Sequence, residues 1–350
     1  MKLNIDDYPS LKKHLSSFGE RLLQDGKPGH RKKTNNKWFE TQDTINYYPE
    51  FEKEKIIWQR VTQRFSFSLI PEGLYVLDSS AFLTGANLKF LIGVLNSKLI
   101  DFYVRTYVHQ YGNTGFLLSN QYVERIPIPE ITKDNKHLIQ EIERNVDKIL
   151  KLKEKEQFIL DSFKKLVENT GQNKFTSPLS QYLKPEKATD YHINLIETKK
   201  LIDDENMGIP RSYKVKSHGK SLTVSVECDG QVEDVISICF DDSTLKEFFH
   251  LAIASVEGKK KAYRSQKKLL ETTLEDIKIP RSAKNRKQDI ENIEKLIEIL
   301  EREYKKKFKK DYPGLSNLRK EIKEVDREID ELVYRLYGLN EKEKKVVEMD

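Results

Sequence analysis

Three stretches of the chain place apolar residues three or four positions apart, as one face of an amphipathic helix requires. They run from Lys136 to Glu168, from Gln288 to Lys309 and from Asn317 to Leu336. The first stretch is long enough for about eight or nine helical turns. Because an apolar stripe needs another apolar surface to cover it, the pattern predicts three long helices that pack on one another like coiled-coil helices.

The first 130 residues are mixed in character and dense in aromatic residues. A short opening helix is predicted from Leu11 to Leu22, and a second helix from Asn87 to about Tyr107, because apolar residues recur there at helical spacing. The β-rich runs Lys55–Val61 and Gly73–Leu77 predict strands. The region is therefore predicted to be an α/β unit, and the two prolines of the run RIPIPE end it.

A second mixed segment lies between the long helices, from about Gly171 to Pro280. Its run SYKVKSHGKSLTVSVE alternates apolar and polar residues and predicts a β-hairpin that turns at His218-Gly219. The two mixed segments end alike, with YVERIPIPE in the first and LEDIKIPR in the second, and each leads into a long helix. This likeness indicates an internal duplication or a convergent two-lobed construction, and coincidence remains open.

Together these patterns predict an α+β protein in which two mixed α/β recognition lobes are joined by long antiparallel helices. The predicted divisions are a first lobe over residues 1–130, a spacer helix over 131–170, a second lobe over 171–282 and C-terminal spacer helices over 283–350. Gly338 follows the last apolar stripe and is placed to end its helix.

Composition adds limited information about partners. Charged residues make up 34% of the 350 residues, and Lys and Arg exceed Asp and Glu by 62 to 56, a net charge of +6. This excess permits a polyanionic partner without requiring one. Cys228 and Cys239 have no second pair to complete a zinc cluster, and no apolar run is long enough to span a bilayer. We therefore expect a metal-free cytoplasmic protein.

Several runs are familiar in their order. They are YPSLKKHLSSFGERL from Tyr8, the basic loop ending in KWFE, the run KEKIIWQ, GVLNSKLIDFYV from Gly93, IPIP, and IDELVYRLYGL from Ile329. In this order the chain resembles the TaqI-like specificity domains of adenine-specific DNA methyltransferases and restriction-modification enzymes, over roughly residues 8–170 and 315–350. The middle segment departs from that pattern. The two-lobed plan also resembles the specificity subunits of type I restriction systems.

The resemblance implies a protein that recognises double-stranded DNA and catalyses nothing itself. Methylating members carry an Asn-Pro-Pro-Tyr or Asn-Pro-Pro-Phe motif for the flipped adenine, and no such motif occurs in this chain. S-adenosylmethionine is therefore expected only in a catalytic partner, an adenine methyltransferase. A nuclease domain or subunit is a further candidate partner. The start of the chain near the usual opening of the module suggests an excised domain or a separate specificity protein.

Polar and cationic runs supply the candidate DNA contacts. The run KPGHRKKTNNK, from Lys27 to Lys37, holds five cations and no carboxylate, which suits phosphate contact and base recognition by Arg and Asn. RVTQR lies beside a predicted strand, RTYVHQYGNTG is a loop rich in groups that suit base edges, and a lysine-rich run follows Gly258. Solvated loops or helix faces are the alternative for each. The predicted DNA-binding residues are Arg31, Lys32, Lys33, Asn36, Lys37, Arg60, Arg64, Arg105, His109, Gln110, Asn113, Lys259, Lys260 and Arg264.

Two other classes of function compete. Glu257-Gly258-Lys259 matches half of a metal-dependent nuclease site, with Asp241 and Asp242 as possible further ligands, although Glu-x-Lys is common by chance in so charged a chain. A protein scaffold built from the long helices is the other alternative, but it would not require mixed lobes with basic polar loops. Trp38 and Trp58 are predicted to anchor the core, because apolar residues flank both.

Overall fold

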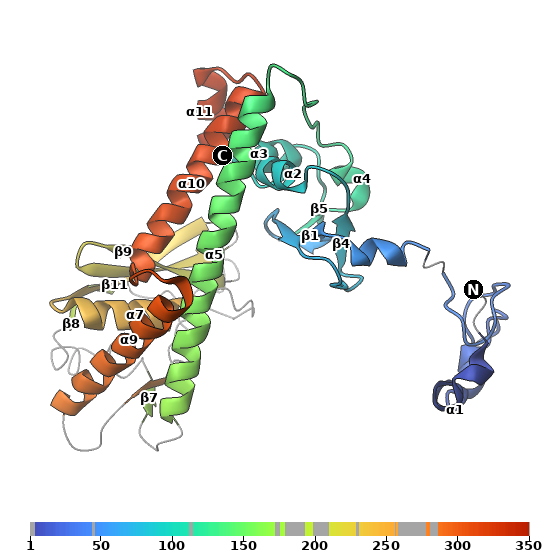
Figure 1. The fold of residues 1–350 in the computed structure, drawn as a ribbon, viewed down its shortest axis with the longest axis horizontal. Coiled ribbons are helices and arrows are strands. Elements are labelled where there is room, and N and C mark those ends of the chain that lie inside the picture. Colours follow the sequence, from blue (N-terminus) through green and yellow to red (C-terminus); the bar gives the residue numbers. More distant parts are fainter. Residues whose placement is uncertain are drawn as a thin grey trace.

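The computed structural model describes residues 4–43, 46–111, 115–171, 176–178, 193–198, 210–228, 231–255, 257, 278–280 and 286–349. These residues form an α+β arrangement of long helices and small antiparallel sheets, which confirms the predicted fold class (Figure 1). The described residues form four parts: an N-terminal segment (residues 4–43), a first α+β unit (46–130), the long helices, and a second α+β unit around the four-stranded sheet. No helix within the described ranges has the length and hydropathy needed to cross a bilayer.

The three predicted long helices are present. They are α5 (Lys136–Gly171), α9 (Arg286–Phe308) and α10 (Leu315–Leu336). With 36 residues, α5 is about 54 Å long, and α9 and α10 lie along it one after the other (Figure 1). Ion pairs of 3.6 Å between Lys148 and Glu321 and 2.8 Å between Glu156 and Arg319 show that α5 and α10 run antiparallel.

The second unit supplies the cap of α10. A short turn separates α9 from α10, and Lys309 and Gly314 in this turn have positive φ values of 55° and 81°. Glu247 of α7 (Ser243–Ala254) accepts a hydrogen bond from the Leu315 backbone N at 2.7 Å and another from the Tyr312 hydroxyl. A carboxylate at a helix N-terminus satisfies an N–H group that has no partner within the helix, so this contact fixes the second unit to α10.

The first α+β unit contains two small sheets. One has the order β3-β1-β4 and the other the order β2-β6-β5. The predicted strand Lys55–Val61 is divided at Arg60, and the predicted strand Gly73–Leu77 is wrong, because these residues form a turn and an exposed loop. The elements are β1 (Lys55–Gln59), β2 (Val61–Thr62), β3 (Phe67–Ile70), β4 (Ser80–Leu83), β5 (Gln110–Tyr111), β6 (Gly115–Leu117), η3 (Tyr48–Glu52) and α4 (Asn120–Val123).

The single helix predicted from Asn87 to Tyr107 is two helices, α2 (Leu88–Leu95) and α3 (Lys98–Arg105). Helix α2 ends at Asn96, whose side chain forms hydrogen bonds of 2.9 Å with both the backbone N–H and the backbone carbonyl of Phe67. The next residue, Ser97, starts α3 and accepts a bond from the Ile100 N at 3.4 Å. Polar side chains with partners outside the helix thus divide an otherwise continuous apolar stripe.

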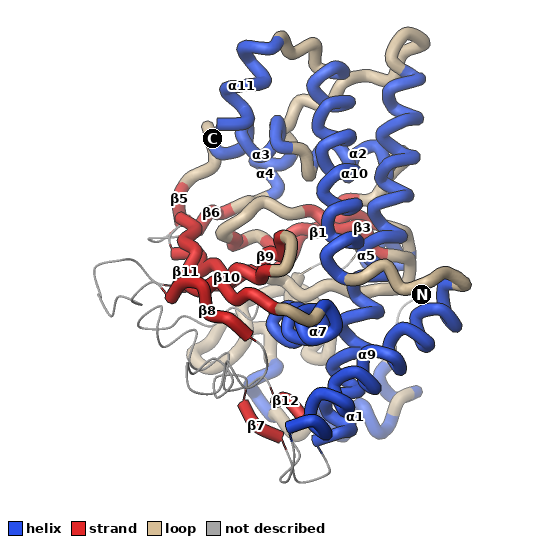
Figure 2. Tube along the Cα trace, turned by 90° about the vertical axis from the view of Figure 1, so that its left-hand side faces the viewer, coloured by secondary structure: helices blue, strands red, loops and turns tan. Residues whose placement is uncertain are grey.

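The second α+β unit is built on a four-stranded antiparallel sheet of order β8-β11-β10-β9, with α7 packed against it. The predicted hairpin is confirmed, but its turn is Gly219-Lys220, one residue later than expected, since His218 pairs with Ser221. Figure 2 shows the strands of the first unit above those of the second, beside the long helices. The strands are β8 (Ile193–Thr198), β9 (Pro210–His218), β10 (Ser221–Cys228) and β11 (Gln231–Phe240), and the short pair β7 (Thr176–Pro178) and β12 (Lys278–Pro280).

The two ends of the chain differ from the predicted pattern. The opening helix α1 (Pro9–Ser16) follows η1 (Ile5–Asp7) and stops early. A second short helix, η2 (Gly19–Leu22), begins at Gly19, whose φ is 59°. Leu11 and Phe18 of the apolar stripe are 44% and 45% exposed, and Figure 1 shows the segment apart from the sheets. At the other end, Gly338 with φ 72° ends α10 as predicted, but α11 (Glu341–Met349) was not expected.

Candidate nucleic-acid interface

Two neighbouring clefts lie on the first α+β unit, on either side of Ser80, which lines both. The larger, of about 940 Å³, is lined by Arg60 together with Thr84, Asn120 and Gln121. The smaller, of about 450 Å³, is lined by Gln59 and Arg64 with several serines. The clefts place two arginines beside amide and hydroxyl groups, and we call this set the polar strip. It consists of Gln59, Arg60, Arg64, Ser66, Ser68, Ser80, Asn120 and Gln121.

The backbone around Arg60 is held from two sides while its side chain stays accessible. Its N–H donates to the Ser79 carbonyl at 3.0 Å, and its carbonyl accepts from the Leu118 N at 2.7 Å. The guanidinium is 45% exposed and lies 3.6 Å from the fully exposed Asp78. Because an ion pair in open solvent is weak, Arg60 can exchange Asp78 for another anion at little cost.

Arg64 sits at the end of a short turn that positions its backbone. The Thr62 hydroxyl donates to the Arg64 carbonyl at 2.6 Å and accepts from the Arg64 N at 3.3 Å. The arginine side chain is exposed on the smaller cleft. The predicted residues Arg60 and Arg64 therefore line two neighbouring clefts that share Ser80.

Arg105 has internal partners. Its guanidinium donates two hydrogen bonds to Asp101, at 3.0 and 3.1 Å, and lies over the rings of Phe65 and Phe116 at 5.3 and 5.4 Å. These contacts tie α3 to the sheet β2-β6-β5. Sequence reasoning did not foresee this role, and DNA contact by Arg105 stays a prediction.

The loop that follows α3 is exposed. His109 and Gln110 are both accessible, and Gln110 lies on β5, where it pairs with Phe116 of β6. The His109 ring meets the Tyr122 ring edge-on at 6.0 Å. Asn113 lies outside the described residues. β6 also holds Leu117, which lines the larger cleft, so Gln110 lies on the strand next to that residue.

The basic loop Lys27–Lys37 is folded around a buried glutamine that the sequence did not single out. Gln24 is 7% exposed, and its amide donates to the carbonyls of Lys37 and Glu40 at 3.0 and 2.7 Å. Arg31 donates to the Glu40 carbonyl at 3.0 Å, and Asn36 to the Thr41 carbonyl at 2.8 Å. Arg31 and Asn36, predicted to read bases, therefore hold the loop together.

The lysines of this loop lie on its surface. Lys33 is exposed, Lys32 pairs with the exposed Asp43, and the Lys37 ammonium lies 5.4 Å from the Phe39 ring centre. These cations are placed for phosphate contact better than for base recognition. Trp38 beside them is half-buried, whereas Trp58 is buried in the core and donates to the Leu118 carbonyl at 3.0 Å, so the core prediction is confirmed for Trp58.

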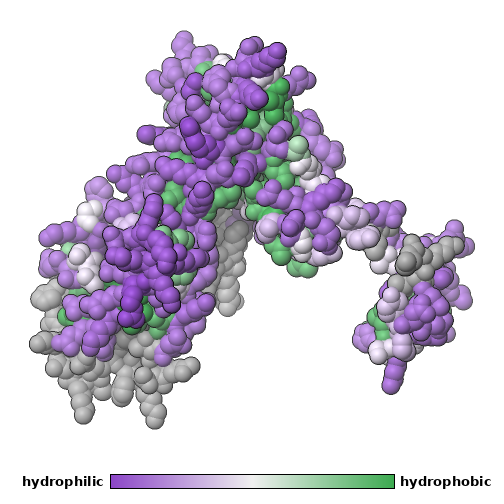
Figure 3. All heavy atoms as spheres, in the orientation of Figure 1, coloured by the Kyte–Doolittle hydropathy of each residue, from purple (hydrophilic) through white to green (hydrophobic). Residues whose placement is uncertain are grey.

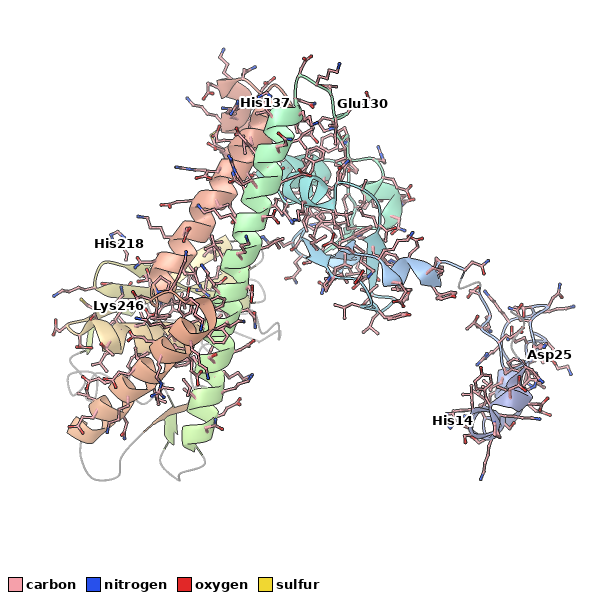
Figure 4. All side chains as sticks on the ribbon, viewed as in Figure 1. His14, Asp25, Glu130, His137, His218 and Lys246 are labelled. Atoms are coloured by element: carbon pink, nitrogen blue, oxygen red, sulfur yellow. The ribbon has the colours of Figure 1, made fainter. Side chains whose placement is uncertain are left out.

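One carboxylate stabilises the base of the loop. Partial burial raises the pKa of Asp25, but hydrogen bonds from His30 and from the Lys27 backbone N, at 2.6 and 3.2 Å, outweigh it and lower the pKa to about 2. Figure 4 labels Asp25 on the N-terminal segment, apart from the first unit. The basic loop and the polar strip are thus two separate surfaces in one chain.

The second unit contributes less to the predicted set. Lys259, Lys260 and Arg264 lie outside the described residues. His218 at the hairpin is exposed and Lys246 of α7 is half-buried, and both are labelled in Figure 4. The Lys246 ammonium donates to the Gly219 carbonyl at 2.6 Å. Lys246 therefore fastens the hairpin turn to α7.

The carboxylates of the suspected nuclease site have structural partners. Glu257 accepts from the Val215 N at 2.5 Å and from Arg319 at 2.6 Å, and Asp242 caps α7 by accepting from the Leu245 N at 2.7 Å. In the described part of the chain, no group of three or more His, Cys, Asp or Glu residues could hold a metal ion. Glu257 serves to fasten β9 to α10, which gives the nuclease alternative no geometric support.

The basic loop, the polar strip and α2–α3 fall within one continuous stretch of the chain. Residues 10–128 match the family model of the TaqI-like C-terminal specificity domain. The match covers about a third of the chain, and it confirms the resemblance over the N-terminal segment and the first α+β unit. The long helices and the second unit lie outside it. No curated protein matches the chain.

Proposed function

We propose that this protein recognises double-stranded DNA for a restriction-modification or related phage-defence system, without catalysing a reaction itself. The observation that carries the proposal is the position of the polar strip and the basic loop. Both lie inside the stretch that matches a specificity domain. Arginines beside amides and hydroxyls are the side chains that bind phosphates and base edges.

The basic loop and the polar strip have different roles in this proposal. Arg60 and Arg64 and the lysines of the basic loop hold the phosphate backbone, which gives affinity without sequence preference. Gln59, Asn120 and Gln121 offer amide groups, each able to donate to and accept from a base edge, so they carry the sequence preference. His109, Gln110 and Asn113 extend this surface, and Lys259, Lys260 and Arg264 add phosphate contacts from the second lobe.

The partner is an adenine methyltransferase, fused or separate, with a nuclease domain or subunit as a possible further component. That partner would bind S-adenosylmethionine and receive the adenine flipped out of the duplex. Residues 1–130 and 171–282 then act as two recognition lobes, and the spacer helices over 131–170 and 283–350 fix the distance between them, in the way that a rigid dimer fixes the spacing of half-sites.

The proposal is tested by measuring the affinity for a fluorescent duplex over a salt series. Replacing Arg60 and Arg64 with alanine should lower the slope of log affinity against log salt by about 1 for each arginine, and weaken binding to all sequences alike. Lys320→Ala is the matched control, because Lys320 is 78% exposed on α10, away from the polar strip. Affinity that does not change with salt, or no affinity at low salt, would contradict DNA recognition and favour a protein scaffold.

A further inference from the structure

A group of large apolar side chains stands exposed at one edge of the first α+β unit. Tyr47 directly precedes η3 and Tyr48 begins it, and Leu74, Tyr75 and Leu77 lie on the loop between β3 and β4. They are 53%, 57%, 48%, 63% and 81% exposed in that order. We call these five residues the aromatic ridge, and Figure 3 shows hydrophobic surface along the lower edge of this unit. Apolar side chains gathered in this way mark an interaction surface.

The aromatic ridge is rigid because a buried lysine holds both of its segments. Lys55 is 0% exposed, and its ammonium donates to the carbonyls of Phe51, Leu74 and Pro71 at 2.8, 3.2 and 3.5 Å. The Phe51 ring stacks on Tyr75, with ring centres 4.8 Å apart. A surface fixed before binding loses little conformational entropy when a partner covers it.

The charge around the aromatic ridge disfavours DNA as its occupant, although Tyr47 and Glu50 also line the larger cleft beside Arg60. Residues 47–54 and 71–78 carry the carboxylates of Glu50, Glu52, Glu54, Glu72 and Asp78 and the single ammonium of Lys53, a formal charge of −4 in a chain of net +6. Phosphates would be repelled by this rim. A protein surface with apolar residues and cations complements it.

The N-terminal segment of this same chain has that complementary chemistry. Tyr8, Leu11, Phe18 and Leu23 are 50%, 44%, 45% and 37% exposed, and the basic loop adds a charge of +5 over Lys27–Lys37. Figure 1 shows this segment away from the ridge within one chain. We propose that the protein forms a two-fold dimer in which the N-terminal segment of each copy covers the aromatic ridge of the other.

Each copy would use both of its surfaces on the other copy, because the same pair of surfaces meets twice across the two-fold axis. The assembly therefore stops at a dimer. The dimer uses the basic loop, so a DNA duplex that binds the loop competes with it. The inference does not depend on DNA recognition, because the contact is made in the absence of DNA.

Sedimentation equilibrium of the full chain at low salt tests the proposal. The parent should show a dimer that dissociates as salt rises. Leu77→Ser should weaken it at least about a hundredfold, because it removes one buried leucine from each of the two contacts and each leucine contributes at least about one factor of ten. Val346→Ser is the matched control, because Val346 is 51% exposed on α11, outside both surfaces. A monomer at all concentrations, or a dimer that Leu77→Ser leaves unchanged, would overturn the proposal.

Charge reversal separates the two surfaces. Glu72→Lys and Lys33→Glu should each weaken self-association by altering both contacts of a homodimer. A mixture of the two variants keeps one unaltered contact, between the parental loop of the first and the parental ridge of the second, so mixed dimers should form where neither variant dimerises alone. If mixing restores nothing, a surface other than the loop and the ridge makes the dimer. DNA affinity of the Leu77→Ser variant, measured separately, reports on the proposed function alone.

Discussion

At the scale of single residues, the joint between the first α+β unit and the long helices contains one buried carboxylate. Asp330 of α10 is 8% exposed and accepts from the Lys98 backbone N, at the start of α3, at 2.9 Å. Burial raises the pKa of Asp330 to about 6, although the Lys98 hydrogen bond and charge lower it. Asp326 and Glu348 add to the increase. The charged form therefore opposes folding at neutral pH.

Replacing Asp330 with asparagine should stabilise the protein above pH 6. The unfolded pKa of an aspartate is about 3.9, so the stability gained by protonation is complete below about pH 4 and lost as pH rises through 6. Asparagine keeps an oxygen acceptor for the Lys98 N and carries no charge. The free energy of unfolding in urea should exceed that of the parent by about 2–3 kcal/mol at pH 7.5 and match it near pH 4.

Asp330→Ala is the comparison variant, since it removes the acceptor as well as the charge and leaves the Lys98 N without its partner. It should be less stable than Asp330→Asn at every pH. An asparagine variant that loses the same stability at pH 4.5 and pH 7.5 would show that the carboxylate is not strained by burial.

The residues of the interface were only partly predictable from the sequence. The cations of the basic loop and the pair Arg60 and Arg64 are visible as local runs. Gln59 and Gln121 are 62 positions apart in the sequence. They line neighbouring clefts only because β1 packs against the residues that precede α4. Gln24 carried no signal either, because its function is to bind backbone carbonyls that lie further along the chain.

At the scale of elements, the long helices were predictable and the shorter ones were not. An apolar stripe sustained over many turns, as in α5 and α10, has one interpretation. The division of α2 from α3 depends on the partners of Asn96 in β3 and of Lys98 in α10, which no local pattern contains. The cap of α10 by Glu247 is also a contact between distant segments.

The packing of α2 on α5 requires a glycine. A Cβ added to Gly93 would lie 2.6 Å from Ile142 Cγ2 and 3.1 Å from Val146 Cγ2. Overpacking of this kind costs about 1–3 kcal/mol, against about 1 kcal/mol that alanine gains over glycine within a helix. Gly93→Ala should therefore lower the free energy of unfolding by up to about 2 kcal/mol, measured by urea denaturation.

The double variant Gly93→Ala, Ile142→Ala identifies the cause. If the clash with Ile142 is responsible, the two changes together should cost less than the sum of their separate costs, because the truncated side chain makes room for the new methyl group. Additive costs, or a Gly93→Ala variant more stable than the parent, would contradict the close approach of α2 and α5.

At the scale of the whole molecule, two α+β units are fixed to one pair of antiparallel helices by carboxylates at helix N-termini. Asp330 of α10 meets α3 of the first unit, and Glu247 of α7 in the second unit meets α10. The α+β class and the long helices followed from the sequence. The positions of the units along α5 did not, because they depend on these contacts between distant segments.

We propose that the protein reads a DNA sequence through the polar strip. The most direct measurement is the selection of bound duplexes from a pool with a randomised centre, followed by sequencing. The parent should enrich one motif, and Gln121→Ala should relax the preference at one position while binding to unselected duplex stays nearly unchanged, since a base contact is worth about 1–3 kcal/mol of discrimination. A pool that remains random after repeated rounds with the parent would contradict the account.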